Sequence, residues 1–319
     1  IGSHLVERLA AAGARVTALA QYNALGTTGW LEELDEAVAD KVTVERGDIR
    51  DPAFVNRLAA GQDVVFHLAA LIAIPHSYVA AQSYVDTNVT GTLNLLEASR
   101  THGVGRFVHT STSEVYGTAI TTPIAEDHPL QGQSPYSASK IGADMMAEAY
   151  ARSFDLPITI LRPFNTYGPR QSERAVIPTV IRQALDPECE AIAVGDIRPT
   201  RDFNYVGDTV AAFTAIGAAD SVAFGIPYNA GSGVAVSVGE MIEQVRAITG
   251  VNKPVVTEEG RMRPEKSEVM TLLADPARLA QATGWSSAVG LEEGLSRTVD
   301  WWRDRLAHGG ARRDRGYLT

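Results

Sequence analysis

Short apolar segments that suit β-strands alternate with longer segments of helical periodicity through the first half of the chain. Leu5, Leu9 and Ala12 recur at helical spacing before Gly13, and an extended stretch follows at residues 14–19. Further strands are expected at residues 42–46, 63–70, 106–112 and 158–163, and helices at residues 88–100 and 137–154. Such alternation predicts right-handed βαβ units and an α/β fold with a doubly wound parallel sheet. The ligands of such a sheet lie at the carboxyl ends of its strands.

The chain starts at an unusual point in this pattern. Its first expected element is a helix at residues 1–12, whereas an alternating fold of this kind begins with a strand. We therefore expect a strand and a glycine-rich turn before Ile1. Gly2 would then be the last residue of a phosphate-binding turn.

The alternation loosens after about residue 165, where loops rich in Pro, Arg and Gly separate shorter expected helices. These helices are expected at residues 175–185, 236–249 and 291–306. We interpret residues 1–165 as the domain built on the sheet. Residues 166–319 are expected to form mainly a smaller C-terminal domain that binds the substrate, interleaved with late elements of the sheet.

Composition argues against several classes of function. The formal net charge of −10 leaves no broad cationic surface, so no nucleic-acid partner is expected. No apolar run approaches the roughly 18 residues of a membrane helix, so no membrane partner is expected. Cys189 is the single cysteine, which suits a reducing cytoplasm. Because His67, His76 and Cys189 lack the spacing of metal ligands, no metal site is expected.

Polar residues gather at the end of one expected strand, in the run Thr110-Ser-Thr-Ser-Glu114. Tyr136 and Lys140 lie four residues apart at the start of an expected helix, so their side chains project from one face. A neighbouring ammonium favours the phenolate form of a tyrosine. Tyr136 is therefore a candidate general base near neutral pH.

Further strings occur in a characteristic order along the chain. They are Ile1-Gly-Ser-His4, Gly47-Asp-Ile-Arg-Asp51, His67-Leu-Ala-Ala70, Asn88-Val-Thr-Gly-Thr92, Arg162-Pro-Phe-Asn-Thr-Tyr-Gly-Pro-Arg170 and Arg201-Asp-Phe-Asn-Tyr-Val-Gly-Asp208. Together with the Tyr136/Lys140 pair, they resemble the extended short-chain dehydrogenase/reductase family, the nucleotide-sugar epimerases and dehydratases. The resemblance covers nearly the whole chain. It implies a Rossmann-like fold, an NAD or NADP cofactor and a nucleotide-diphosphate sugar as substrate.

The resemblance also implies which residues hold the cofactor. They are Ile1, Gly2, Gln21, Asp48, Ile49, Leu68, Ala69, Ala70, Asn88, Thr110, Tyr136, Lys140 and Pro163. Gly2 would lie against the pyrophosphate, and Asp48 and Ile49 would flank the adenine. Members that use NAD usually end the second strand of the sheet with an acid that binds the adenine ribose, whereas this chain has Gln21. Because no arginine is offered there for a 2′-phosphate, NAD is expected and NADP stays open.

The reaction implied by the resemblance begins with oxidation of the sugar at C4. Tyr136 would accept the proton of the 4-hydroxyl, Thr112 would bind the same oxygen, and Lys140 would support Tyr136. Glu114 stands where galactose-type epimerases generally have a small or hydroxyl residue, and its carboxylate could remove the C5 proton. Loss of the 6-hydroxyl and return of hydride to C6 would complete a 4,6-dehydration. Ser113 completes the expected catalytic set, but the acid that protonates the leaving hydroxyl stays open.

Two alternative reactions stay open, those of a UDP-glucuronate decarboxylase and of a nucleotide-sugar 4-epimerase. The Thr112-Ser113-Glu114 string resembles GDP-mannose 4,6-dehydratases and UDP-glucuronate decarboxylases, whereas dTDP-glucose dehydratases carry Asp at the position of Ser113. Strings such as Gln21-Tyr22-Asn23 are most similar to bacterial 4,6-dehydratases of the legionaminic-acid type, which act on a nucleotide-linked N-acetylhexosamine.

The substrate contacts implied by the resemblance are Thr112, Asn165, Arg201 and Arg263. Arg201 and Arg263 are the candidates for the substrate diphosphate, because a guanidinium fork suits phosphate oxygens. Arg170 and Arg174 stay open between surface positions and substrate contacts.

Family members usually form homodimers through a four-helix bundle. In this chain the bundle would use the helix after Asn88 and the helix that carries Lys140. Their outer faces are expected to carry Leu95, Met145, Met146 and Ala149. A relative that binds the cofactor without catalysis would typically lack Tyr136 or Lys140, and both are present.

Overall fold

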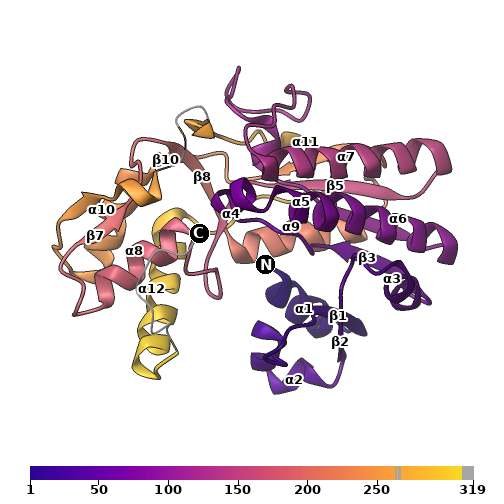
Figure 1. The fold of residues 1–319 in the computed structure, drawn as a ribbon, viewed down its shortest axis with the longest axis horizontal. Helices are drawn as coiled ribbons and strands as arrows, with labels where there is room; N and C mark the ends of the chain where they lie inside the picture. Colours follow the sequence, from indigo (N-terminus) through magenta and orange to yellow (C-terminus); the bar gives the residue numbers. More distant parts are fainter. Residues whose placement is uncertain (263, 265–266, 311–319) are drawn as a thin grey trace.

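A parallel sheet in the order β3-β4-β5-β9 forms the centre of the computed structural model, which describes residues 1–262, 264 and 267–310 (Figure 1). Its strands are Val64–His67 (β3), Arg106–Thr110 (β4), Ile158–Pro163 (β5) and Pro227–Ala230 (β9). Every residue of β5 is buried, as expected for a parallel strand with both faces covered. The predicted α/β fold with a parallel sheet is therefore confirmed.

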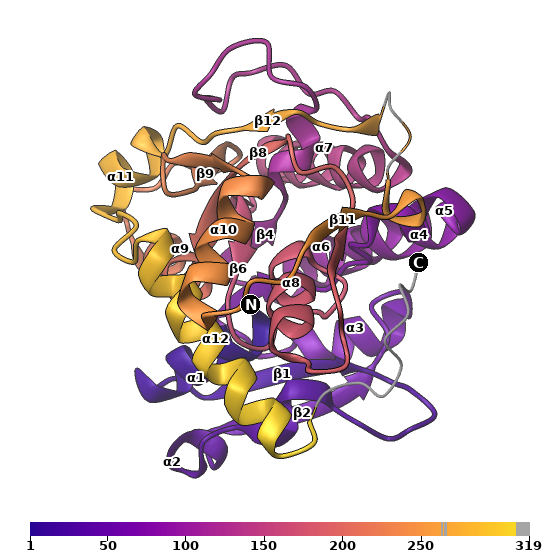
Figure 2. The same cartoon turned by 90° about the vertical axis from the view of Figure 1, so that its left-hand side faces the viewer.

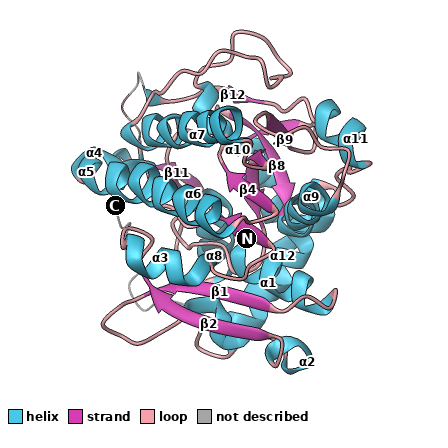
Figure 3. Cartoon of the chain, turned by 90° about the vertical axis from the view of Figure 1, so that its right-hand side faces the viewer, coloured by secondary structure: helices cyan, strands magenta, loops and turns pink. Residues whose placement is uncertain are grey.

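Two further parallel strands precede this sheet in the chain. Val16–Gln21 (β1) pairs with Val42–Gly47 (β2), in register from Val16 opposite Val42 to Gln21 opposite Gly47, and Figure 3 shows the two strands side by side. Within the described residues, β1 has no strand partner except β2, and β3 has none except β4. The strand expected before Ile1 lies outside the sequence and stays a prediction.

Helices cover both faces of the central sheet. They are α3 (Pro52–Ala59), α6 (Gly91–His102) and α7 (Pro135–Phe154) on one face, and α1 (Gly2–Ala11), α9 (Val206–Ala218) and α11 (Ala277–Thr283) on the other. Successive side chains of a strand point to opposite faces, so the β4 residues Phe107 and Val108 enter different hydrophobic cores. The sheet is doubly wound, as predicted.

A third hydrophobic core surrounds Trp302, which is 2% exposed. The elements that carry it lie together beside the central sheet (Figures 1 and 2). The strands and helices of this core are β6 (Asn165–Tyr167), α8 (Val176–Leu185), β7 (Ile192–Val194), β8 (Thr200–Tyr205), β10 (Ala235–Ser237), α10 (Val238–Thr249), β11 (Val255–Thr257) and α12 (Leu291–Ala307). The short strand β12 (Thr271–Leu272) pairs with β8, but its Leu272 packs in another core with Tyr116 and Phe164. Between these elements in the chain, α9 and β9 return to the central sheet.

Several boundaries differ from the sequence-based expectation. The strand expected at residues 63–70 ends at His67, and the strand expected at residues 106–112 ends at Thr110. The helix expected from Asn88 begins earlier, because α5 (Ala81–Tyr84) continues through a π-helical segment, Val85–Thr90, into α6. π-helical turns inside helices are frequent near functional sites.

The remaining short elements are η1 (Gly29–Glu33), α2 (Glu36–Ala39), α4 (Ile74–Val79), η3 (Ser113–Tyr116) and η4 (Glu259–Arg261). None of the helices in the described part of the chain is long and apolar enough to cross a membrane.

Candidate active site

The predicted catalytic residues meet where β4 ends and α7 begins. Thr112 starts η3 by accepting a hydrogen bond from the main-chain N–H of Glu114 (3.3 Å). Ser134 caps α7 through a capping box, which places Tyr136 in the first helical turn and Lys140 one turn later. The Tyr136 hydroxyl is hydrogen-bonded to the Thr112 side chain. The structure therefore brings these predicted residues to the carboxyl end of a central strand.

Lys140 is held by the last residue of β4. Its Nζ donates a hydrogen bond to the carbonyl oxygen of Thr110 (2.6 Å), and the residue is 3% exposed. Burial lowers the pKa of the Lys140 ammonium to about 8, and the nearby Asp144 carboxylate opposes this shift. Lys140 is thus still mainly protonated at pH 7.

Tyr136 is a buried phenol. Burial raises the pKa of Tyr136 well above its usual range, and the negative charge of Glu114 raises it further. The hydrogen bond with Thr112 acts in the opposite direction. Burial therefore outweighs the influences that favour the phenolate, and deprotonation of Tyr136 near neutral pH needs added positive charge.

A second tyrosine covers this centre, although the sequence analysis did not single it out. Tyr84 is 1% exposed and packs edge-to-face on Tyr136, with ring centroids 6.3 Å apart. Its hydroxyl donates a hydrogen bond to the carbonyl oxygen of Ala73 (2.5 Å). Ile74 completes this small apolar cluster, which helps exclude water from the Tyr136 hydroxyl.

The start of α1 offers groups that fit a phosphate. In the described part of the chain no side chain caps this helix at Ile1, so its first main-chain N–H groups keep their hydrogen-bonding capacity, and Gly2 leaves open space beside them. The guanidinium of Arg170 lies nearby: it pairs with Glu7 through Nη2 (2.9 Å), while its buried Nη1 has no hydrogen-bond partner among the described residues. An uncapped helix start beside an unsatisfied guanidinium nitrogen fits the pyrophosphate of a dinucleotide.

Gln21, Asp48 and Ile49 lie at or just beyond the carboxyl ends of β1 and β2. Gln21 is exposed. The Asp48 carboxylate accepts hydrogen bonds from Arg50 (Nε to Oδ1 3.0 Å), which holds the pKa of Asp48 below its usual value. Ile49 is 4% exposed and packs closely against Gly91, so a ligand at this position would meet its main chain rather than its side chain.

Asn88 ties the loop that follows β3 to α7. Its side chain accepts a hydrogen bond from the N–H of Leu71 (2.8 Å) and donates to the Leu71 carbonyl (3.0 Å) and to Ser139 Oγ (2.9 Å). Ser139 lies directly before Lys140, and Leu71 directly follows the predicted cofactor residues Leu68, Ala69 and Ala70. Asn88 therefore acts here as a link between two parts of the site. Pro163 is the buried last residue of β5.

The predicted substrate contacts lie on β6 and β8. Asn165 begins β6, and its buried Nδ2 has no hydrogen-bond partner among the described residues. Arg201 of β8 is 7% exposed and pairs with Glu268 (2.8 Å), a partner that the sequence analysis did not identify. A substrate diphosphate at Arg201 would compete with this carboxylate. Arg263 lies outside the described residues.

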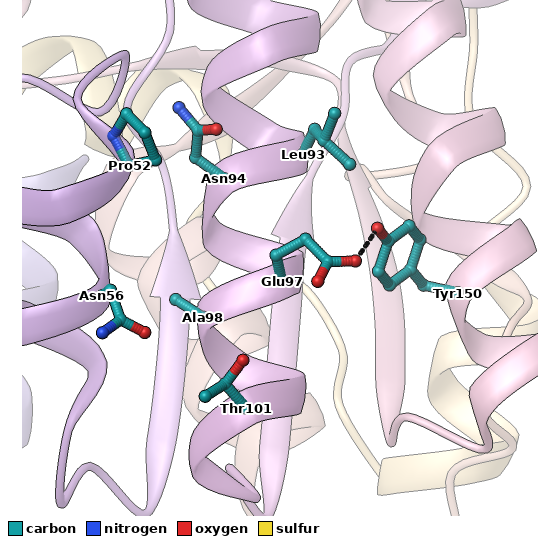
Figure 4. Close-up of a pocket in the computed structure, with 8 residues that line it drawn as sticks. All are labelled: Pro52, Asn56, Leu93, Asn94, Glu97, Ala98, Thr101 and Tyr150. Carbon is teal, nitrogen blue, oxygen red and sulfur yellow. Dashed lines mark hydrogen bonds between the residues drawn. The ribbon is translucent and has the colours of Figure 1, made fainter.

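A separate groove lies between α3, α6 and α7, where the Tyr150 hydroxyl donates a hydrogen bond to Glu97 (Figure 4). It is lined by Pro52, Asn56, Leu93, Asn94, Glu97, Ala98, Thr101 and Tyr150, none of which is a predicted site residue.

The apolar residues expected on the outer faces of α6 and α7 divide into two groups. Met145 is 42% exposed, Ala149 is also exposed, and Met146 is half-buried. The expectation for Leu95 was wrong. It is 7% exposed and faces the core with Leu96, because it lies on the inner side of α6.

The fold and this site define an NAD-dependent nucleotide-sugar epimerase/dehydratase of the extended short-chain dehydrogenase/reductase type. The chain belongs to the GDP-mannose 4,6 dehydratase family, whose model matches residues 1–298. It is 34% identical over 309 residues to a dTDP-glucose 4,6-dehydratase of an Actinoplanes species, across 95% of this chain and 94% of the relative. It is also 33% identical over 311 residues to a UDP-glucose 4-epimerase of Mycolicibacterium smegmatis, across 96% of each chain.

A solved structure with a similar fold is that of the dTDP-glucose 4,6-dehydratase DesIV from Streptomyces venezuelae, which has NAD bound. The TM-score is 0.85 at 29% identity, across 96% of this chain and 95% of that one. These relatives are named as dTDP-glucose dehydratases or as an epimerase, so they give no support to the expected likeness to the legionaminic-acid type.

Proposed function

We propose that this protein is a nucleotide-diphosphate-sugar 4,6-dehydratase that uses NAD. The observation that carries this proposal is the position of Glu114, a carboxylate beside the hydrogen-bonded Tyr136 and Thr112 side chains. A base at this position is needed to remove the C5 proton, whereas an epimerase only has to turn the 4-keto sugar over. Glu114 therefore favours dehydration over epimerisation.

In the first step, Tyr136 takes the proton of the sugar 4-hydroxyl and Thr112 holds the same oxygen. NAD, when bound, would supply the hydride acceptor for oxidation at C4 and the hydride donor for reduction at C6. The Lys140 ammonium, held against the Thr110 carbonyl, supplies positive charge that favours the Tyr136 phenolate. Because burial raises the pKa of Tyr136, the positive charge of an oxidised cofactor, when bound, would also favour the phenolate.

In the second step, Glu114 removes the C5 proton that the 4-keto group has made acidic, and the 6-hydroxyl leaves as water. Ser113 is buried at the same strand end, but its hydroxyl is a poor acid. The dTDP-glucose dehydratases carry Asp at this position. We therefore propose that Glu114, once protonated, or a water molecule that it binds, donates the proton to the leaving hydroxyl.

We propose that the cofactor lies along the ends of β1, β2, β3 and β4. Its pyrophosphate would lie at Ile1 and Gly2 with Arg170 on one side, and its adenine near Asp48 and Ile49. The missing acid at Gln21 leaves NADP as an alternative cofactor. The remaining cofactor contacts are proposed to be Leu68, Ala69, Ala70, Thr110 and Pro163.

We propose that residues 166–319 form mainly the substrate-binding domain. Asn165, at its border, offers an unsatisfied Nδ2 to the sugar nucleotide, and Arg201 offers a guanidinium to the diphosphate, together with Arg263. A homodimer through α6 and α7 is also proposed, because Met145 and Ala149 are exposed on α7.

The product mass tests this proposal. The protein, supplied with NAD, would be incubated separately with dTDP-glucose, GDP-mannose, UDP-N-acetylglucosamine, UDP-glucuronate and UDP-glucose, with Tyr136→Phe as the inactive control. We expect at least one of these sugars to lose water. Loss of carbon dioxide from UDP-glucuronate would instead identify a decarboxylase, and an isomer of unchanged mass would identify an epimerase. Turnover of UDP-N-acetylglucosamine would favour the legionaminic-acid type.

A further inference from the structure

Asp144 is a fully buried carboxylate one helical turn after Lys140 on α7. Asp144 accepts hydrogen bonds from the residues on either side of Thr110, which are His109 on β4 and Ser111 just after the strand. Its Oδ1 accepts a hydrogen bond from His109 Nε2 (3.1 Å), and its Oδ2 accepts one from Ser111 Oγ (2.7 Å). Thr110 itself accepts the hydrogen bond from Lys140. Three consecutive residues of the strand end are thus tied to α7.

Arg162 extends this arrangement to the segment that carries Glu114. Its Nε and Nη2 donate to Asp144 Oδ2 (3.2 and 3.0 Å), while its Nη1 donates to the Tyr116 hydroxyl (3.0 Å). The guanidinium also lies over the Tyr116 ring, 5.0 Å from its centroid. Tyr116 is the last residue of η3, and its hydroxyl donates to Asn229 on β9 (2.7 Å).

A buried ion pair of this kind is a poor source of stability. Asp144 and Arg162 are 0% and 1% exposed, and the loss of hydration of two such charges commonly cancels their attraction. Apolar side chains of similar size often give an equally stable core. The charged pair does provide a defined geometry, because its hydrogen bonds hold the strand ends and helices at fixed distances and angles.

We propose that Asp144 is a positioning residue that sets the two halves of the catalytic centre relative to each other. Through Ser111 and His109 it fixes the strand end that holds Lys140 and Thr112. Through Arg162 and Tyr116 it fixes η3 and therefore Glu114. We call the bonds to Ser111 and His109 the first arm, and the bonds through Arg162 to Tyr116 the second arm. This inference rests on the proposed function, because it assigns the first arm to oxidation at C4 and the second arm to removal of the C5 proton.

The two sets of hydrogen bonds, from Asp144 to Ser111 and His109 and from Asp144 through Arg162 to Tyr116, can be tested separately in the complete enzyme with NAD. Ser111→Ala removes the hydrogen bond from Ser111 to Asp144, and Tyr116→Phe removes the hydroxyl that accepts from Arg162 and donates to Asn229. Single-turnover absorbance in the near ultraviolet follows the reduced cofactor as it forms and then disappears. We expect Ser111→Ala to slow its formation about tenfold, and Tyr116→Phe to slow its disappearance about tenfold, so that reduced cofactor accumulates only in the second variant.

Matched controls separate positioning from general damage to the fold. Ser99→Ala and Tyr228→Phe alter buried residues of the same types, and the Tyr228 hydroxyl binds only the main chain of Ala223 among the described residues. Glu148→Gln, one turn beyond Asp144, is the control for Asp144→Asn. The controls should keep both rates, and Asp144→Asn should slow both steps without weakening the binding of UDP or dTDP.

Equal slowing of both steps in Ser111→Ala and in Tyr116→Phe would overturn the proposal, as would unchanged rates in both. Because Ser111→Ala and Tyr116→Phe each remove a single hydroxyl, they test the proposal even if Asp144→Asn does not fold. If the wild-type enzyme oxidises C4 but releases no water, the proposed dehydration is wrong. The proposed role of the Ser111 hydrogen bond is then still tested by the rate at which Ser111→Ala forms reduced cofactor compared with the wild type.

Discussion

At the scale of single residues, the proposed choice of dehydration over epimerisation rests on Glu114. We predict that Glu114→Gln keeps oxidation at C4 and loses elimination, because the amide retains the shape of the side chain but cannot accept the C5 proton. Turnover should fall by about two to four orders of magnitude, a typical contribution of general-base catalysis. Reduced cofactor should accumulate after substrate is added, which is visible as near-ultraviolet absorbance.

Tyr136→Phe is the comparison for this experiment, since it should slow the first hydride transfer and give little reduced cofactor. If Glu114→Gln forms dehydrated product at nearly the wild-type rate, the base lies elsewhere.

The buried charge of Lys140 lowers the stability of the folded protein. The pKa of Lys140 is lowered to about 8 in the folded protein, compared with 10.5 for an exposed lysine. Below pH 8 the folded protein buries a charged ammonium, which lowers the free energy of unfolding by about 3 kcal/mol. This destabilisation disappears as the pH rises from 8 to 10.5, because Lys140 then loses its proton in the unfolded state as well. We therefore predict that Lys140→Met raises the free energy of unfolding at pH 7.

The predicted gain in stability shrinks by about 2 kcal/mol between pH 7 and pH 10. Urea unfolding of both proteins at the two pH values, without added cofactor, measures this difference. A gain that does not change with pH would mean that Lys140 is not a buried cation in the folded state.

At the scale of elements, the start of α1 and the loop after β6 are proposed to bind the pyrophosphate of the cofactor together. We predict that Arg170→Gln raises the Kd for NAD about tenfold, because one charge-assisted hydrogen bond to the pyrophosphate is lost. The affinity for UDP or dTDP should stay unchanged. Equilibrium dialysis or a fluorescence titration measures both constants.

Arg198→Gln is the matched control, because Arg198 has a highly exposed side chain that pairs with Asp196. An unchanged affinity of Arg170→Gln for NAD would place the pyrophosphate away from this arginine.

At the scale of the whole molecule, α6 and α7 are the elements proposed to bind a second copy. We predict a homodimer at micromolar concentration, with Met145→Glu shifting it towards monomer, because a charge would replace an exposed apolar side chain at the contact. Light scattering measures the mass of each variant. Val256→Glu, at a similarly exposed position on β11, should leave the mass unchanged.

A monomeric wild-type protein at this concentration would contradict the dimer. An unchanged dimer of Met145→Glu would move the interface to another face.

Much of the fold was predictable from local patterns. The strand at residues 158–163 has the bounds of β5, and the helix expected at residues 137–154 begins only two residues late compared with α7. The alternation of strands and helices depends on periodicity, which is a local property of the chain. The sequence predicted that later segments would join the sheet but not which ones. The pairing of β9 with β5 could not be predicted, because it joins segments far apart in the sequence.

The sequence by itself determined the chemistry on offer at the strand end, since Thr112, Glu114, Tyr136 and Lys140 are recognisable from type and spacing. Only the tertiary structure decided their surroundings. Burial raises the pKa of Tyr136 and lowers that of Lys140, and burial depends on which elements cover the site. The partners of Arg162 and Asp144 come from different elements that fold together. No spacing along the chain encodes such a network, because its hydrogen bonds exist only once those elements are packed.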